Sequence, residues 1–144
     1  MGDPPRKILI AVDGSAQTER MLTYLAEHHL LAAGNDFTAM TVVLELPKRA
    51  ASYVNADVVK GYYQEEADKV LDPVRAFFAQ KGLSANFEFK VGHPAQELAQ
   101  TAEKQGFDLV ALGSHGHGAL GNLIMGSVAT KVVAQCKVPV LLLR

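Results

Sequence analysis

Five glycines fall within the fifteen residues 113–127, which read GSHGHGALGNLIMGS. Glycine lets the backbone approach a ligand closely and turn its N–H groups toward an anion. Gly126 and Ser127 stand directly before a segment with helical periodicity, and the N–H groups at a helix N-terminus favour phosphate. A plain surface connection is the alternative, but a long glycine-rich loop in a small domain is more often functional. The segment is therefore predicted to bind a phosphorylated ligand.

Two better-known phosphate motifs do not fit this loop. Gly116, Gly118 and Gly121 spell G-x-G-x-x-G, the dinucleotide fingerprint. That motif also needs an acidic residue about 20 positions later to bind the ribose, and no Asp or Glu follows Asp108. The chain also contains no G-K-[ST] triplet, which the phosphate-binding P-loop requires. Neither a dinucleotide site nor a P-loop hydrolase is expected.

The loop also carries His115, His117 and Ser114, which could do other chemistry. A His-x-His pair can begin a zinc site, but the loop offers no Asp, Glu or Cys as a third ligand. Ser114 is not part of a G-x-S-x-G nucleophile motif. The sequence therefore disfavours a hydrolase or transferase function, because no nucleophile–base pair can be named. No metal ligand and no catalytic residue are predicted.

Asp13 is the second candidate for chemistry, because it ends a short apolar run and is followed by Gly14 and Ser15. One interpretation is structural, since Asp often forms turns and caps helices. The other is that its carboxylate accepts a hydrogen bond from an amino or hydroxyl group of a ligand, or acts as an outer-shell magnesium ligand. The position of Asp13 favours the second interpretation.

Composition limits the class of protein that carries these residues. The chain has 144 residues, of which 49% are apolar and 20% charged, so it can bury a core as one domain spanning residues 1–144. Its net charge of −1 disfavours nucleic-acid binding. It has one cysteine, no apolar stretch approaching 18 residues, and too short an apolar run before Asp13 for a signal peptide. We expect a cytoplasmic protein with no membrane partner.

Hydrophobic periodicity predicts five strands that alternate with helices. The strands are expected at residues 7–12, 37–44, 85–91, 108–112 and 138–143. The first expected helix runs from the N-cap Ser15 to a stop at Gly34. The second is a long segment that Pro73 kinks or divides and that Gly82 ends. The other two run from Pro94 to Gly106 and from Ser127 to about Cys136. Residues 48–56 show no period and are expected to be a loop.

This order predicts an α/β protein with an open parallel sheet and crossover helices. Ligands bind such sheets beyond the carboxyl ends of the strands where the strand order reverses. If the first and fourth strands are the central neighbours, Asp13 and the glycine-rich loop face that crevice together. Strand 85–91 alternates strictly and should be an edge with one wet face. Strand 138–143 should be the other edge, and its apolar sequence predicts antiparallel pairing with a second copy as a homodimer.

The spacing of Gly113-x2-Gly116-x9-Gly126-Ser127 resembles the G-x2-G-x9-G-[ST] signature of the universal stress protein family, and of its ATP-binding branch in particular. The opening KILIAVDGS, the TVV of the second strand and the closing VPVLLLR are similar as well, so the resemblance covers essentially the whole chain. It implies a Rossmann-like fold of the adenine nucleotide alpha hydrolase type. That fold is an open five-stranded parallel sheet of order 3-2-1-4-5 with helices on both faces, and the resemblance also implies a homodimer.

The resemblance also implies where a nucleotide would bind. Ala11 and Asp13 would lie beside the adenosine and Val42 would touch the adenine, while the glycines of the loop would wrap the ribose and phosphates. The implied nucleotide-binding residues are Ala11, Val12, Asp13, Val42, Gly113, Ser114, His115, Gly116, His117, Gly118, Gly126, Ser127 and Val128. The segment between Gly113 and Gly126 has no Lys or Arg. Backbone N–H groups, Mg²⁺ and Lys131 would therefore balance the negative charge of the phosphates.

The function implied is that of a nucleotide-responsive stress protein that binds ATP, with ADP or AMP as alternatives, together with Mg²⁺. No residue is placed as a general base for attacking water, so the chain is expected to be at most a slow ATPase. The rival hypothesis is a dimeric interaction protein of the same fold that does not bind nucleotides. All three signature glycines and Ser127 are present, which favours binding.

Overall fold

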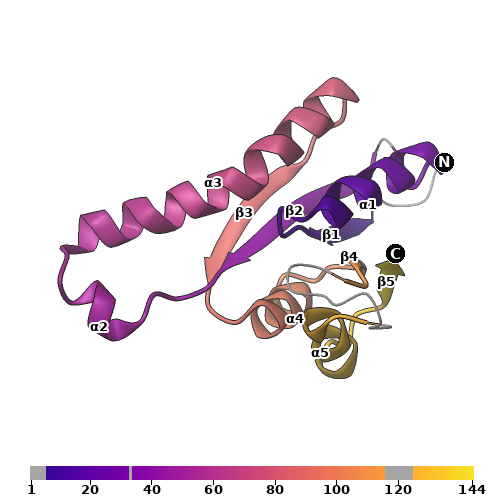
Figure 1. Cartoon of the computed structure of the whole chain (residues 1–144). Helices are drawn as coiled ribbons and strands as arrows, with labels where there is room; N and C mark the ends of the chain where they lie inside the picture. Colours follow the sequence, from indigo (N-terminus) through magenta and orange to yellow (C-terminus); the bar gives the residue numbers. More distant parts are fainter. Residues whose placement is uncertain (1–5, 33, 116–124) are drawn as a thin grey trace.

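The computed structural model describes residues 6–32, 34–115 and 125–144. Five parallel strands form one sheet of order β3-β2-β1-β4-β5, with helices on both of its faces (Figure 1). The strand order implied by the family resemblance and the parallel direction predicted from the sequence pattern are both confirmed. The elements are β1 (Lys7–Ala11), α1 (Ala16–Glu27), β2 (Asp36–Val43), α2 (Lys48–Ala51), α3 (Ala56–Gln80), β3 (Asn86–Val91), α4 (Pro94–Lys104), β4 (Leu109–Gly113), α5 (Ser127–Gln135) and β5 (Val140–Leu143).

The alternation of side chains along the strands divides the core into two layers. On one face, Ile10 of β1 packs with α1 and α3, whose apolar stripes include Met21 and Leu71. On the other face, Leu9 of β1 packs with α4 and α5, for example against Leu98. Both faces of β1 are therefore buried, which explains why its sequence is continuously apolar rather than alternating.

Helix α1 ends earlier than predicted, at Glu27 rather than near Gly34. His29 has φ of +58°, and the N–H of Leu30 donates to the carbonyl of Leu25 at 2.8 Å. This is the Schellman arrangement that usually has glycine in the left-handed position. A histidine there gives no signal in the sequence, so the prediction of the stop at Gly34 was wrong. The glycine stops at Gly82 and Gly106 are confirmed, with φ of +68° and +70°.

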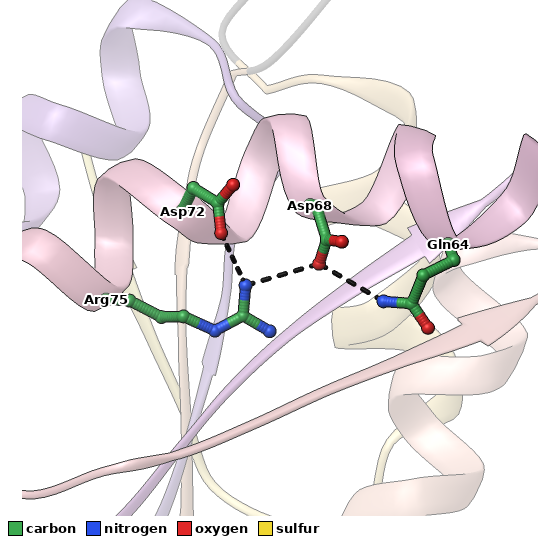
Figure 2. Close-up of polar contacts among 4 residues, drawn as sticks. All are labelled: Gln64, Asp68, Asp72 and Arg75. Atoms are coloured by element: carbon green, nitrogen blue, oxygen red, sulfur yellow. Dashed lines mark hydrogen bonds and ion pairs between the residues drawn. The ribbon is translucent and has the colours of Figure 1, made fainter. Parts of the chain in front are cut away.

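Pro73 does not divide α3, which is one helix of 25 residues (Figure 1). Figure 2 shows Arg75 donating to Asp72 at 2.7 Å and to Asp68 at 3.2 Å, a bridge that spans the proline. Gln64 extends the network by donating to Asp68. Partial burial lowers the pKa of Arg75, but the hydrogen bonds to the two carboxylates outweigh it and the pKa is raised. These bonds and the buried stripe of α3, formed by Ala67, Leu71, Val74 and Phe78, support one continuous helix across the lost backbone hydrogen bond.

Two further predictions need correction. The segment 48–56 was expected to be a loop, but Lys48–Ala51 form the single turn α2, which is too short to show a period. Strand β3 is an edge as predicted, yet its polar side is only partly exposed to solvent, with Asn86 exposed. Glu88 and Lys90 are half-buried, because α4 packs against Met40 on the neighbouring strand, the residue paired with Glu88.

The remaining boundaries agree with the prediction to within two residues, the usual scatter at element ends. In the part of the chain that the structure describes, no helix is long and apolar enough to cross a membrane.

Candidate functional site

A cavity of about 670 Å³ opens at the carboxyl ends of β1, β2 and β4. The strand order reverses here, since the chain runs outward from β1 through β2 to β3 and then returns to β4 on the other side. The size lies within the range of small-molecule sites. The cavity therefore occupies the place where open parallel sheets bind ligands.

The sequence predicted thirteen site residues, of which Gly116, His117 and Gly118 lie outside the described residues. The structure brings the other ten together around the one cavity. They are Ala11, Val12, Asp13, Val42, Gly113, Ser114, His115, Gly126, Ser127 and Val128. They come from the ends of β1, β2 and β4 and from the start of α5. Their role in binding a ligand stays a prediction.

Asp13 forms the turn between β1 and α1. Its Oδ1 accepts from the N–H of Ser15 and from the hydroxyl of Thr18, both at 2.9 Å, and its own N–H donates to Thr18 Oγ1 at 3.2 Å. Ser15 is the N-cap of α1, as predicted, but its own side chain makes no capping bond. The carboxylate of Asp13 is half-buried at the cavity wall. It therefore serves the turn and is also in position to face a ligand.

The two described ends of the glycine-rich segment are tied together. The N–H of Gly126 donates to the carbonyl of Ser114 at 2.6 Å, and the N–H of Ser114 donates to the carbonyl of Leu143 at the end of β5 at 2.7 Å. The hydroxyl of Ser114, which is buried, lies 2.9 Å from Nδ1 of His115. Residues 114 and 126 are thus held side by side at the mouth of the cavity.

Gln17 is a site residue that sequence reasoning missed. It lines the cavity from the first turn of α1 and is buried, with 6% of its surface exposed. Its Oε1 accepts from the N–H of His115 at 2.8 Å, and its Nε2 donates to the carbonyl of Leu143 at 3.1 Å. The only signal for Gln17 in the sequence is that it is a polar residue on the buried face of a predicted helix, the face that it shares with Met21 and Leu25.

Backbone N–H groups for an anion are found at the start of α5. The N–H groups of Ser114, His115 and Gly126 already donate to protein oxygens. Ser127 and Val128 begin α5 and line the cavity, and the first N–H groups of a helix have no acceptor within the helix. The dipole of this nine-residue helix adds partial positive charge at the same point. A phosphate group at the start of α5 would therefore find hydrogen-bond donors and partial positive charge.

The side chains around the cavity carry negative charge. Asp13 and Glu66 contribute carboxylates, and no Lys or Arg is among its lining residues within the described ranges. Glu66 pairs with Lys69 at 2.9 Å, and the hydrogen bond to Glu66 and its charge raise the pKa of Lys69. Lys131, a predicted phosphate partner, lines a separate groove between α4 and α5. The triphosphate of ATP would find no fixed cation on the described wall.

Apolar side chains form the other walls of the cavity. Val42 and Met40 of β2 contribute from one face of the sheet, where they belong to the core layer of α4 and α5. Leu44 and Tyr62 lie on the outer rim, where α3 extends past the end of β2 (Figure 1). An apolar wall opposite a helix N-terminus suits a flat base linked to a phosphate.

Comparison with known proteins gives consistent matches along the chain. Residues 5–144 match the model of the universal stress protein family. Universal stress protein YxiE of Bacillus subtilis is 28% identical over 150 residues, which cover 96% of this chain and 98% of YxiE. Protein MJ0577 of Methanocaldococcus jannaschii has a solved structure with a TM-score of 0.79 at 26% identity, covering 98% of this chain and 96% of that one.

A universal stress protein from Archaeoglobus fulgidus, solved in complex with dAMP, shares the fold. Its TM-score is 0.68 at 19% sequence identity, and the match covers 99% of this chain and all of that chain.

Proposed function

Because the chain belongs to the universal stress protein family, we propose that it binds an adenine nucleotide in the cavity beyond β1 and β4 and responds to that nucleotide as a regulatory protein. The observation that carries the proposal is the convergence of the ten described residues on one cavity. They come from the two ends of the signature segment and from the ends of β1 and β2. The dAMP complex of the Archaeoglobus fulgidus relative supports the choice of an adenine nucleotide.

Each part of a nucleotide has a counterpart on the cavity wall. The phosphate lies at the N–H groups of Ser127 and Val128, where the helix dipole favours negative charge. The base packs against Val42. The carboxylate of Asp13 accepts a hydrogen bond from an amino or hydroxyl group of the nucleoside.

ATP is the proposed physiological ligand, with ADP and AMP as alternatives, and its binding depends on Mg²⁺. The described wall presents Asp13 and Glu66 and no Lys or Arg, and the sequence of residues 116–124 contains none either. Two carboxylates repel a triphosphate and attract a divalent cation, and Mg²⁺ is commonly held by one or two carboxylates plus substrate phosphates. Asp13 is therefore the residue that would hold Mg²⁺ through its water ligands, since Glu66 is already paired with Lys69.

The proposed role is binding, with at most slow hydrolysis of ATP. Efficient phosphoryl transfer needs a group that orients the attacking water and cations that stabilise the developing charge. The contact of the Ser114 hydroxyl with Nδ1 of His115 at 2.9 Å places a hydroxyl group beside an imidazole on the described wall. Ser114 is buried and its backbone is fixed on both sides, so we assign this pair to holding the loop.

The protein is proposed to form a homodimer through β5, which is an edge of the sheet. Pro139 and Leu143 turn their carbonyls toward β4, so the backbone groups of Val140 and Leu142 point outward in the alternating pattern of a parallel strand. The strand has no charged residue before Arg144. An uncovered apolar edge of this kind is stabilised when a second copy pairs with it about a two-fold axis.

Nucleotide analysis of the purified protein tests the proposal directly. The protein is denatured and the released small molecules are separated and identified, and titration calorimetry with ATP, ADP and AMP then gives the affinities. We expect a co-purified adenine nucleotide or an affinity in the micromolar range or better. If none of the three binds the folded protein, the rival hypothesis of a dimeric interaction protein without a nucleotide replaces this one.

A further inference from the structure

Gln17 connects three separate parts of the chain with one buried side chain. Its Oε1 accepts the N–H of His115, two residues past β4, and its Nε2 donates to the carbonyl of Leu143, the last residue of β5. The same carbonyl of Leu143 also accepts the N–H of Ser114 at 2.7 Å. A carboxamide is suited to this place, since it offers an acceptor and a donor on one planar group.

Gly113 is shaped to this side chain. A Cβ atom at position 113 would lie 3.0 Å from both Cδ and Oε1 of Gln17, which is tighter than most real Cβ contacts, so the carboxamide would have to shift by a few tenths of an ångström. Gly113 is not among the glycines with positive φ, so its backbone conformation does not by itself require glycine. A side chain at the first glycine of the G-x2-G-x9-G-[ST] signature would therefore press on the carboxamide of Gln17.

We propose that Gln17 is the positioning residue of the nucleotide site: it fixes the backbone of residues 113–115 on the cavity wall in the arrangement that binding requires. The inference rests on the proposed function. Gln17 acts through the protein backbone, by holding His115 and the end of β5 in one arrangement. Without it the N–H of His115 loses this acceptor, and the backbone of Ser114 and His115 is held less firmly at the cavity wall.

The substitution Gln17→Met tests this role, because methionine keeps the length and approximate volume of glutamine and removes both hydrogen bonds. Gln80→Met, on an exposed residue at the end of α3, is the matched control. Two quantities are measured below the unfolding temperature of each variant: amide hydrogen exchange at His115 without nucleotide, and affinity for ATP with Mg²⁺ and for AMP. We expect faster exchange at His115 and about tenfold weaker binding in Gln17→Met, the scale of one lost hydrogen bond, and no change in the control.

A double-mutant cycle separates positioning from a general loss of stability. Gly113→Ala alone should weaken binding, because the new methyl group displaces the carboxamide of Gln17. In a Gln17→Ala background the same methyl group meets no side chain there, so Gly113→Ala should cost little more affinity. A purely structural role would lower the unfolding temperatures and leave the affinities of the folded variants alone.

The outcomes distinguish the inference from the proposed function. Faster exchange at His115 with unchanged affinity overturns the positioning role and leaves nucleotide binding in place. Unchanged exchange shows that Gln17 does not hold His115, which also overturns the role. If the wild-type protein binds neither ATP nor AMP, the proposed function fails and the positioning role fails with it, while the exchange result still reports on the hydrogen bond.

Discussion

Replacing Asp13 with alanine removes the residue that both forms the turn after β1 and faces the cavity. The Oδ1 atom accepts two hydrogen bonds at 2.9 Å, from the N–H of Ser15 and the hydroxyl of Thr18. Each is worth about 0.5–1.5 kcal/mol, so the free energy of unfolding should fall by about 2 kcal/mol. For a chain of this length that lowers Tm by about 4–8 °C. The Asp13→Ala protein should therefore still be folded at 25 °C.

Nucleotide affinity should fall independently of this loss of stability. One charge-assisted hydrogen bond to the ligand contributes about 1–2 kcal/mol, which corresponds to about 5–30-fold in Kd. Asp13→Asn separates the two effects. An amide keeps one acceptor oxygen, which can serve the turn, but its other atom is a donor and cannot accept from the nucleotide. We expect Asp13→Asn to keep nearly the wild-type Tm and to lose affinity as the alanine variant does.

Thermal unfolding followed by circular dichroism gives Tm, and calorimetric titration with AMP and with ATP plus Mg²⁺ gives Kd. The comparison of AMP with ATP also separates the two proposed contacts, since loss of an outer-shell magnesium contact would affect ATP alone. If Asp13→Asn binds both nucleotides as tightly as the wild type does, the carboxylate serves only the turn. In that case the placement of the nucleoside beside Asp13 is refuted.

Three further predictions concern the phosphate, the metal and the dimer. Gly126→Val should abolish nucleotide binding in a folded protein. Gly126 has φ −73° and ψ 166°, a conformation that valine adopts readily, and the valine side chain would fill the space before α5. Unchanged ATP affinity by calorimetry would contradict this prediction. Removing Mg²⁺ with a chelator should weaken ATP binding by tenfold or more and leave AMP binding nearly unchanged, since the described wall has carboxylates and no Lys or Arg. Equal losses of affinity for both nucleotides would show that the metal does not act on the phosphates. Val140→Pro removes one outward N–H of β5 and should shift the protein toward monomer in sedimentation equilibrium, whereas the Val140→Ala protein should stay dimeric. A wild-type monomer at micromolar concentration would refute the dimer itself.

The sheet was predictable because its strands are short apolar runs separated by helix-length segments, and this pattern has few alternatives among known topologies. The convergence of Asp13, Val42 and the described ends of the glycine-rich segment on one cavity agrees with the same pattern. Parallel strands bring their carboxyl ends to one edge, so residues that end strands become neighbours.

The errors arise where tertiary contacts override local sequence signals. His29 takes a left-handed conformation that its residue type rarely adopts, so the end of α1 could not be read from the sequence. Pro73 was expected to kink α3 or divide it, and the division is wrong, because the buried stripe and the bridge from Arg75 to Asp68 and Asp72 support one continuous helix. Glu88 was assigned to a wet face because alternation cannot show that a helix covers the neighbouring strand.

Gln17 was missed for a different reason. Its partners are 98 and 126 residues away in the sequence, and both are backbone groups, which carry no signature of their own. A buried polar residue can be located from helical periodicity, but its partners cannot.

The position of β1 in the sheet has a consequence for biosynthesis. Its partner β4 lies far along the chain, as shown by the N–H of Lys7, which donates to Asp108 at a separation of 101 residues. At a translation rate of about 5–20 residues per second, β1 therefore waits roughly 5–20 s for β4 to be made. During that time it is an unprotected sheet edge with the apolar sequence Ile8-Leu9-Ile10, which favours pairing with other nascent chains. The growing chain should then be a client of ribosome-associated chaperones until residues 109–113 emerge and complete the centre of the sheet.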